Sequence, residues 1–320
     1  QRFHMGDVPR LGGLAVVAGV AVSSLRAAFS PAWGDVGALS LAWVEWITWW
    51  AVVAPALIGG WYEDLTQKLA ARWRLLLTLA SSFLAIMSLD VAIPRLGLDW
   101  VDAWWQITPW PGIVFALVAV AGLPHAFNII DGYNGLASMV ALIVSLALGY
   151  VALKVGDWVL VGWLLTIAGA TFGFLLWNYP KGLLFAGDGG AYFWGATLAV
   201  ASIQLVQRHD EVSPWFPLLL LIYPIWETLF SIYRKLARGE SPGVADALHF
   251  HQLIYRRIVR EVFHDDEARR MLTRNNRTSP YLWGFTLMTV IPAVLFWKNT
   301  PVLMAFCALF VLTYVPAYLM

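Results

Sequence analysis

Long apolar runs dominate this sequence and constrain its fold more than any other feature. A helix that crosses a bilayer needs about 17–25 mostly apolar residues, and ten stretches approach that length. They cover approximately residues 11–29, 41–60, 74–93, 111–127, 136–153, 158–176, 191–206, 215–233, 280–297 and 301–319. None has the alternating pattern of a membrane β-barrel strand. The sequence therefore predicts an all-α, polytopic integral membrane protein with about ten transmembrane helices.

The composition supports this fold class and excludes several others. Of the 320 residues, 60% are hydrophobic and only 13% are charged, whereas an average soluble domain has about 25% charged residues. A soluble globule, a disordered chain and a nucleic-acid-binding protein are therefore excluded. The 19 Trp and 17 Phe residues suit a chain with two membrane–water interfaces, where aromatic rings collect. The single cysteine, Cys307, leaves no disulfide framework and no cysteine-based metal site.

The distribution of basic residues predicts the orientation of the chain. Ten spans place the loops alternately on two sides. One of these sides, with its helix ends, holds five of the 21 basic residues, namely Arg26, Arg95, Lys154, Arg208 and Lys298. The positive-inside rule makes the other side cytoplasmic. Because the chain starts at Gln1 directly on a polar motif, a helix preceding it is a further expectation.

The longest stretch outside the predicted spans covers residues 235–279, within what we predict to be one transmembrane domain over residues 1–320. In this cytoplasmic loop Ile254, Ile258 and Val262 recur at four-residue intervals, with arginines between them. The pattern predicts a basic amphipathic helix lying at the membrane surface. An ordinary solvated helix covering the cytoplasmic face explains it equally well.

Five polar clusters lie on the predicted cytoplasmic side. The first reads Pro9-Arg10-Leu11-Gly12-Gly13. The proline fixes the start of a helix, and the glycine pair allows a backbone or a ligand to approach closely. Arg10 has the geometry to hold a phosphate. A positive anchor with a flexible turn is the structural alternative.

The second cluster is a pair of adjacent acids, Glu63 and Asp64, at the end of a predicted span. A helix C-terminus disfavours negative charge, so the pair needs a compensating cation. Lys68, four residues after Asp64, could supply it. A metal ion or a phosphate proton would give the pair a function, whereas a solvated loop with one ion pair would not.

The third cluster contains Asn128 and Asp131, followed by the turn signal Asn134-Gly135. Asn128 and Asp131 are three residues apart, which places both on one face of a helical turn. The spacing is common, so a capped helix end followed by a tight turn is the alternative.

The fourth cluster surrounds Asp188 with Gly187, Gly189 and Gly190, just before a helix expected from about residue 191. Backbone N–H groups at such a helix start can bind phosphate. One oxygen of Asp188 could hold a hard cation such as Mg²⁺ that bridges to phosphate. A simple N-cap is the alternative, but three glycines exceed what a cap needs.

The fifth cluster holds His249 and His251. Side chains two residues apart point the same way only in extended backbone, so a loop could present both imidazoles to one anion. Zinc is poorly supported because no third ligand lies at the usual spacing. Taken alone, His249 is better explained by a structural role.

In this order, the five clusters resemble the polyprenyl-phosphate N-acetylhexosamine-1-phosphate transferase family, often called glycosyl transferase family 4. The matching strings are 9–13, 63–64, 128–132, 185–188 and 249–251, and the resemblance runs from residue 4 to about residue 257. It implies transfer of a sugar 1-phosphate from a UDP-N-acetylhexosamine to undecaprenyl phosphate with release of UMP. It further implies dependence on Mg²⁺, with Mn²⁺ as an alternative, and a cytoplasmic active site in the bacterial inner membrane.

The resemblance also assigns roles to individual residues. Asp188 resembles the metal ligand, and Phe185 resembles the aromatic residue that stacks on uracil. The other matches are Asp64 and Glu63 with the acidic pair, Asn128 and Asp131 with the nucleotide and phosphate pocket, and His249 and His251 with a loop over the pyrophosphate. In this scheme Arg10 or Lys68 acts as a further clamp on phosphate.

The sequence departs from the common family pattern at a few positions. The acidic pair begins with Glu63 where Asp is usual, and Asn134 and Ala191 replace an Asp and a Ser. The histidine loop continues with Gln252, unlike the branch that uses UDP-MurNAc-pentapeptide. The resemblance therefore favours UDP-GlcNAc or a related sugar and the start of O-antigen or other surface polysaccharide synthesis.

Two other classes of function are possible for a membrane protein of this composition. A membrane transporter keeps polar residues near the bilayer midplane, whereas the clusters here lie at predicted helix ends. A non-catalytic scaffold for polysaccharide assembly would need none of the five clusters. The oligomeric state stays open, with a homodimer as one option, and membrane lipids are expected to surround the spans.

Overall fold

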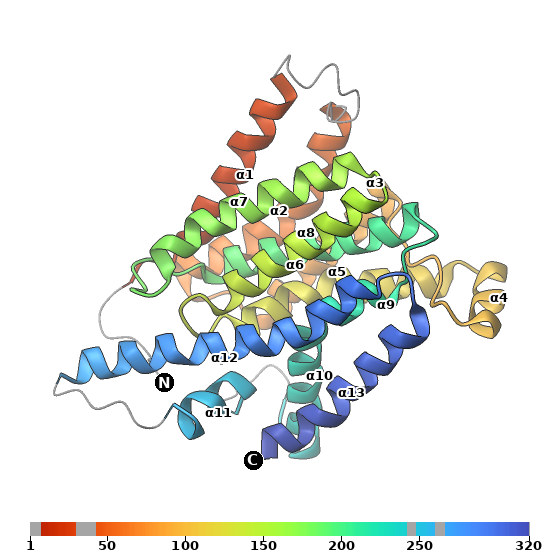
Figure 1. Ribbon diagram of the computed structural model, residues 1–320. Helices are drawn as coiled ribbons and strands as arrows, with labels where there is room; N and C mark the ends of the chain where they lie inside the picture. The colour runs from red at the N-terminus through yellow and green to blue at the C-terminus, as the bar shows by residue number, and fades with distance from the viewer. Residues whose placement is uncertain (1–7, 30–42, 242–247, 260–265, 320) are drawn as a thin grey trace.

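The computed structural model describes residues 8–29, 43–241, 248–259 and 266–319. Within these ranges the chain forms helices and no strands, which confirms the all-α class. The helices are α1 (Gly12–Phe29), α2 (Trp43–Thr66), α3 (Ala71–Leu89), α4 (Asp99–Ile107), α5 (Trp110–Ile130), α6 (Leu136–Lys154), α7 (Trp158–Asn178), α8 (Gly187–Arg208), α9 (Trp215–Leu220), α10 (Ile222–Ala237), α11 (Phe250–Arg257), α12 (Glu267–Leu295) and α13 (Thr300–Leu319) (Figure 1).

Seven helices in the described part of the chain are long and apolar enough to cross a membrane. They are α3, α5, α6, α7, α8, α12 and α13. Gly12–Arg26 of α1 forms a further, shorter apolar helix. The prediction of a polytopic, all-α membrane protein is confirmed, while the count of ten spans stays a prediction.

The span predicted over residues 215–233 is wrong as one continuous helix. The chain forms α9 and α10 instead, and Leu221 between them has φ −101° and ψ 7°. Proline lacks an N–H group, and its ring clashes with the carbonyl four residues earlier in a continuous helix. Pro224 would meet the carbonyl of Leu220 in this way, which explains the break.

The amphipathic helix predicted around residues 254–262 differs from the structure in its bounds and its surroundings. Helix α11 ends at Arg257, and Ile258 after it is exposed, while Val262 lies outside the described residues. The apolar residues Phe250, Leu253 and Ile254 are among the buried residues of α11. The helix packs against protein, including α12, and not on a membrane surface. Helix α12 also begins thirteen residues before the predicted span at 280, so the loop predicted over 235–279 is shorter.

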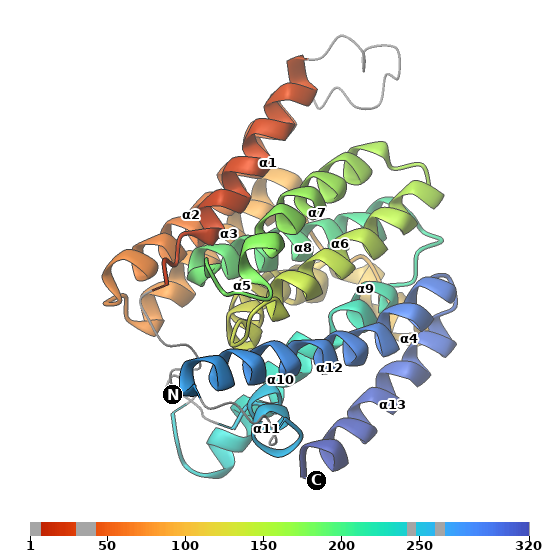
Figure 2. The same cartoon turned by 60° about the vertical axis from the view of Figure 1, so that its left-hand side comes forward.

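Helix α8 is the centre of the fold. Every residue from Gly189 to Val206 is buried, and α1, α2 and α5 pack around the helix (Figure 2). Small residues in membrane helices let neighbouring backbones approach closely. At Gly195, for example, a Cβ atom would collide with the backbone of Pro124. The glycine therefore lets α5 approach the backbone of the central helix closely at this point.

The chain reverses direction between successive helices, which gathers the polar clusters at one end of the bundle. Glu63 and Asp64 lie in the last turn of α2, and Asn128 lies in the last turn of α5. Asp188 lies in the first turn of α8. The C-terminal ends of α2 and α5 therefore meet the N-terminal end of α8.

Candidate active site

Glycines allow three helices to meet at the start of α8. A Cβ atom at Gly13 of α1 would collide with the backbone of Gly190, and one at Gly60 of α2 would collide with the backbone of Gly189. Gly187, the first residue of α8, has φ +71°, a conformation that side chains disfavour. The close approach of a backbone that was expected for the glycine pair of the first cluster is therefore confirmed.

The first cluster is joined to the fourth by backbone hydrogen bonds. The N–H of Gly12 donates to the carbonyl of Phe185 at 2.8 Å, and the N–H of Phe185 donates to the carbonyl of Pro9 at 2.9 Å. Gly13 makes the next bond of the series, to Ala186 at 2.8 Å. These bonds hold the backbone of Phe185 three residues before Asp188 and leave its ring partly exposed.

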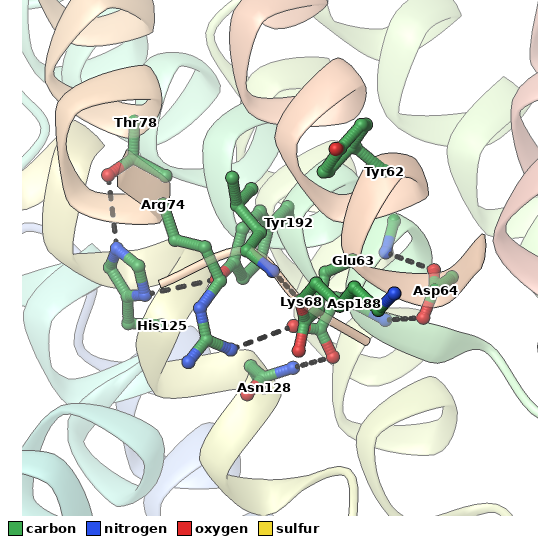
Figure 3. Close-up of polar contacts among 12 residues, drawn as sticks. Tyr62, Glu63, Asp64, Lys68, Arg74, Thr78, His125, Asn128, Asp188 and Tyr192 are labelled. Atoms are coloured by element: carbon green, nitrogen blue, oxygen red, sulfur yellow. Dashed lines mark hydrogen bonds and ion pairs between the residues drawn. The ribbon is translucent and has the colours of Figure 1, made fainter. Parts of the chain in front are cut away.

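Two side chains from different helices hold the carboxylate of Asp188 (Figure 3). The side-chain amide of Asn128 on α5 donates to Oδ1 at 2.8 Å. A guanidinium nitrogen of Arg74 on α3 donates to Oδ2 at 3.2 Å. The Asp188 side chain is 17% exposed, so the carboxylate is oriented by protein and still reachable from outside.

Asp64 binds the helix that carries Asp188. Its two oxygens accept hydrogen bonds from the backbone N–H groups of Asp188 at 2.8 Å and of Gly189 at 2.9 Å. The first turn of a helix leaves such N–H groups without partners inside the helix, and a negative charge is favoured there. Asp64, which lies on α2, therefore caps the N-terminus of α8.

We expected Lys68 to compensate the negative charge of Asp64, but the structure gives Asp64 other partners. No ion pair joins Asp64 to Lys68 in the described structure, and Lys68 is exposed. Burial raises the pKa of Asp64 to about 6, and the nearby charge of Asp188 adds to this effect. The two backbone N–H groups and the charge of Arg10 act in the opposite direction and favour the ionised form.

Glu63 has a different task from its neighbour. Its Oε2 accepts a hydrogen bond from the backbone N–H of Leu69 at 2.8 Å, and its carbonyl accepts one from Gln67 at 2.7 Å. Gln67 has φ +53°, where the chain turns from α2 into α3. Glu63 thus fixes the turn that leads to Arg74, whereas Asp64 fixes the start of α8.

Asp131 adds a third carboxylate to the site. It ends α5, and its N–H donates to the carbonyl of Asn128 at 3.3 Å. Burial raises the pKa of Asp131 to about 7, and the charges of Asp188 and Asp64 raise it further, while that of Arg10 lowers it. The mutual electrostatic effects of these acids indicate that the second, third and fourth clusters form one site.

The donor set of this site suits a hard cation. Mg²⁺ is typically held by one or two carboxylates together with substrate phosphates, and Asp188 offers an oriented, accessible carboxylate. Asp64 and Asp131 add negative charge next to Asp188. This charge raises the free-energy cost of ionising all three carboxyl groups together. In the described ranges, no three His, Cys, Asp or Glu side chains form a complete metal site by themselves. The residues therefore fit an ion shared with a phosphate better than a closed structural metal centre.

Asn134, which replaces an acid of the common pattern, has a structural role. It is 1% exposed. Its backbone N–H donates to Oδ1 of Asn275 at 2.8 Å, and its side-chain amide donates to Oδ1 of Asn276 at 3.1 Å. The turn after α5 is therefore fastened to α12, and residue 134 lies away from solvent.

A buried carboxylate positions the first histidine of the fifth cluster. Glu227 on α10 is fully buried, and its Oε1 lies 3.0 Å from Nδ1 of His249. The same carboxylate accepts the backbone N–H of Phe250 at 3.1 Å and the hydroxyl of Tyr314 at 2.6 Å. These contacts join α10, α11 and α13 and set the orientation of the His249 ring.

His251 connects the fifth cluster to the third. Its ring stacks on His249, with ring centroids 5.4 Å apart, and contacts Tyr133 edge-on at 5.5 Å. A Cβ atom at Gly132 would come within 2.9 Å of Nε2 of His251. His251 is 1% exposed, and burial lowers its pKa to about 4. His251 therefore packs as a neutral ring beneath the Asp131-Gly132 turn.

Several residues that complete the site lie outside the five clusters. Arg74 on α3 pairs with Asp188. His125 on α5 lies between Thr78 at 3.1 Å and Tyr192 at 3.3 Å. A polar residue within an apolar span signals function by default, and that signal was present at both His125 and Glu227.

A polytopic membrane protein with buried acids at one end of its helix bundle is the class that the fold and the site define. The family model for glycosyl transferase family 4 matches residues 46–206. This is half of the chain, and it contains the second, third and fourth clusters. The chain belongs to glycosyl transferase family 4.

Individual relatives carry more specific names. The chain is 25% identical over 252 residues to a probable undecaprenyl-phosphate N-acetylglucosaminyl 1-phosphate transferase of Bacillus subtilis, a match covering 78% of this chain and 66% of the relative. It is 32% identical over 145 residues to an undecaprenyl-phosphate alpha-N-acetylglucosaminyl 1-phosphate transferase of Thermotoga maritima, covering 45% of this chain and 44% of the relative.

A relative from another branch matches to a similar degree. The chain is 30% identical over 227 residues to the phospho-N-acetylmuramoyl-pentapeptide-transferase of Leuconostoc mesenteroides, covering 67% of each chain. The matched segments thus span two thirds or less of the first two relatives, and about two thirds of the third.

Proposed function

We propose that this protein transfers N-acetylhexosamine 1-phosphate from a UDP-sugar to undecaprenyl phosphate and releases UMP. The observation that carries the proposal is the carboxylate of Asp188, which Asn128 and Arg74 orient and which Asp64 supports through the backbone. An oriented, partly accessible acid at the start of a helix suits two anionic substrates and a bridging cation.

The reaction is a phosphoryl transfer, for which positioning and charge neutralisation supply most of the catalysis. An oxygen of the lipid phosphate attacks the β-phosphorus of the UDP-sugar. The bond from that phosphorus to the bridging oxygen breaks, and UMP leaves with both electrons of the bond. The attacking and leaving oxygens must be held in line, which requires groups on two sides of the phosphorus.

Different residues of the site supply the positioning and the charge neutralisation that this reaction needs. Asp188 would hold Mg²⁺, or Mn²⁺ in its place, which neutralises charge on the pyrophosphate. Asp64 holds Asp188 in place and can use a remaining lone pair to accept the proton of the lipid phosphate, while Asp131 adjoins the same site. Arg10, which is exposed and whose charge acts on both acids, is placed to bind phosphate.

The remaining roles follow from the first and fifth clusters. Phe185 would stack on uracil, because the backbone bonds of the loop fix its position and leave its ring partly exposed. His249, oriented by Glu227, would contact the pyrophosphate, and His251 would support it by ring stacking. Lys68, which is exposed and free of Asp64, is available for the lipid phosphate.

The acceptor and the location follow from the same arrangement. An acid site at the end of a membrane helix bundle lets a lipid phosphate arrive from the bilayer and a soluble nucleotide arrive from water. The basic residues of the corresponding loops favour the cytoplasmic face of the bacterial inner membrane. The names of the Bacillus and Thermotoga relatives support N-acetylglucosamine as the sugar. The start of surface polysaccharide synthesis is the role that we propose for this transfer.

A transfer assay tests the proposal. Purified protein is incubated with undecaprenyl phosphate, Mg²⁺ and radiolabelled UDP-sugars, and label in the organic phase is counted together with UMP. We expect equal amounts of lipid-linked label and UMP with UDP-GlcNAc or another UDP-HexNAc, and much less with UDP-MurNAc-pentapeptide. Efficient transfer from the pentapeptide donor would move the protein to the other branch, and no transfer from any donor would overturn the proposal.

A further inference from the structure

Helix α4 lies at the opposite end of α5 from the Asp188 site (Figure 1). Helix α5 has 21 residues and is therefore about 30 Å long at 1.5 Å per residue. Asn128 stands near its end, whereas α4 immediately precedes its start. With nine residues, α4 is too short to cross a membrane.

The helix has two chemically different faces. Trp100, Trp104 and Ile107, spaced four and three residues apart, are 79%, 55% and 82% exposed. Asp99 and Gln106, seven residues apart, lie on the other face. A short helix with one exposed aromatic stripe and one polar stripe is typical of a helix lying in a membrane interface.

An apolar hollow of about 740 Å³ lies between α4 and the first turns of α5. Trp100, Trp104, Trp110 and Phe115 are among the residues that line it, and all of its lining residues are apolar or aromatic. The lining offers no charged side chain that would bind a phosphate. The hollow therefore suits a hydrocarbon chain.

Hydrogen bonds hold α4 in this orientation independently of its exposed stripe. The carboxylate of Asp102 accepts the N–H groups of Leu96, Gly97 and Leu98 at 2.6, 2.9 and 3.1 Å. Arg95 just before it donates to the carbonyls of Val206, His209, Asp210 and Val212 and to the carboxylate of Asp210. The exposed tryptophans are thus presented by a fixed element.

The hollow continues the surface that α5 presents to lipid. Trp110, Val114 and Val118 on this spanning helix are 69%, 54% and 62% exposed. Trp110 and Val114 line the hollow, and Val118 lies one turn further along. Any chain that covers α5 in a bilayer therefore reaches the hollow without crossing polar surface.

We propose that α4 is an interfacial helix in the leaflet opposite the Asp188 site, and that the hollow between α4 and α5 holds an acyl chain of a membrane phospholipid. Tryptophan is favoured at this depth because its ring is apolar and its N–H is polar. The polar stripe carries Asp99 and Gln106, and α4 has no basic residue, so binding does not depend on anionic headgroups. The inference is independent of the catalytic proposal.

The depth of α4 is tested with spin labels in phosphatidylcholine nanodiscs. Replacing the buried Cys307 by Ser provides a background without cysteine. Trp104→Cys and Ile107→Cys then report on the aromatic stripe, and Gln106→Cys is the matched control on the other face. We expect labels at 104 and 107 to be at least threefold more accessible to oxygen, relative to a water-soluble nickel complex, than the label at 106. Equal, water-like values at all three positions would overturn the interfacial placement.

The hollow itself is tested with a phosphatidylcholine that carries a photoreactive group in its acyl chain. We expect crosslinks on the α4 peptide in the wild type, and several-fold fewer in Val114→Trp, which narrows the hollow at its wall on α5. Val118→Trp adds the same side chain outside the hollow and should leave the crosslinks unchanged. Equal crosslinking in both variants, or none in the wild type, would show that no lipid chain occupies the site. Addition of phosphatidylglycerol should not increase the signal.

Discussion

The carboxylate of Asp64 accepts the backbone N–H groups of Asp188 and Gly189 at 2.8 and 2.9 Å. The acidic residue of α2 therefore determines where α8 begins, and with it the direction in which the Asp188 side chain points. Two clusters 124 residues apart in the chain act as one unit. This dependence leads to different expectations for the acids of the site.

Replacing Asp188 by Asn should abolish turnover and leave the protein folded. Asn keeps the size of the side chain and one oxygen for Asn128, but it removes the charge that pairs with Arg74 and would hold the cation. UMP release and lipid-linked product report on turnover, and gel filtration with thermal unfolding reports on the fold. Wild-type activity in the variant at saturating Mg²⁺ would rule out Asp188 as the metal ligand.

Replacing Asp64 by Asn should lower the rate by about 10²–10⁴, the usual contribution of a positioned acid or base. The variant can still accept one of the two N–H groups, but its charge is lost. Glu63→Gln is the matched control, because it keeps an oxygen for the N–H of Leu69, and it should be milder. Glu63→Asp should also be tolerated, since it keeps the charge. A greater loss in Glu63→Gln than in Asp64→Asn would reverse the roles of the pair.

Replacing Phe185 by Ala should weaken binding of the UDP-sugar more than it slows the chemistry. The loop bonds of residue 185 come from its backbone, so the variant retains them. Stacking of a base on an aromatic ring contributes about 1–3 kcal/mol, and the KM for the nucleotide sugar should therefore rise tenfold or more at nearly constant kcat. An unchanged KM would contradict the stacking role.

Replacing Glu227 by Gln should reduce activity through His249 and not through loss of the fold. The amide retains one acceptor oxygen but cannot stabilise a charged or strongly polarised His249 ring. We expect kcat to fall about tenfold, less than the 10²–10⁴ that a positioned acid or base contributes, with the protein still folded. Steady-state kinetics measure the first effect, and thermal unfolding measures the second.

Tyr314→Phe is the matched control for this prediction. It removes one hydrogen bond to the same carboxylate and leaves the contact between Glu227 and His249 intact. It should cost about 0.5–1.5 kcal/mol of stability, as a typical hydrogen bond does, with little effect on kcat. Equal losses of activity in the two variants would indicate that Glu227 only stabilises the fold.

The sequence allowed prediction of the helices and polar clusters, because both depend on local chemistry. Apolar runs must form helices in a bilayer, since each backbone polar group needs a partner within its own segment. Charged residues are excluded from such runs, so the polar clusters had to lie at helix ends. Asp188 at the start of α8 and Asn128 at the end of α5 were found in this way.

Contacts between distant helices could not be predicted. Lys68 was expected beside Asp64 because the two are four residues apart, but α2 ends at Thr66, where the spacing rule for helices ceases to apply. Arg74 reaches Asp188 only because α3 packs near the start of α8. Pro217 and Pro224 indicate a break near Leu221. The hydropathy of residues 215–233 alone instead predicts one continuous span.

The glycine contacts at the start of α8 make the geometry of the site depend on residues that have no functional group. A single methyl group at Gly13 or Gly60 would push α1 or α2 away from the backbone of α8. Because Gly60 lies one helical turn before Asp64 on α2, such a displacement would also disturb the bonds from Asp64 to the backbone of Asp188 and Gly189. The spacing between two of the acids of the site is therefore set by hydrogen atoms in place of side chains.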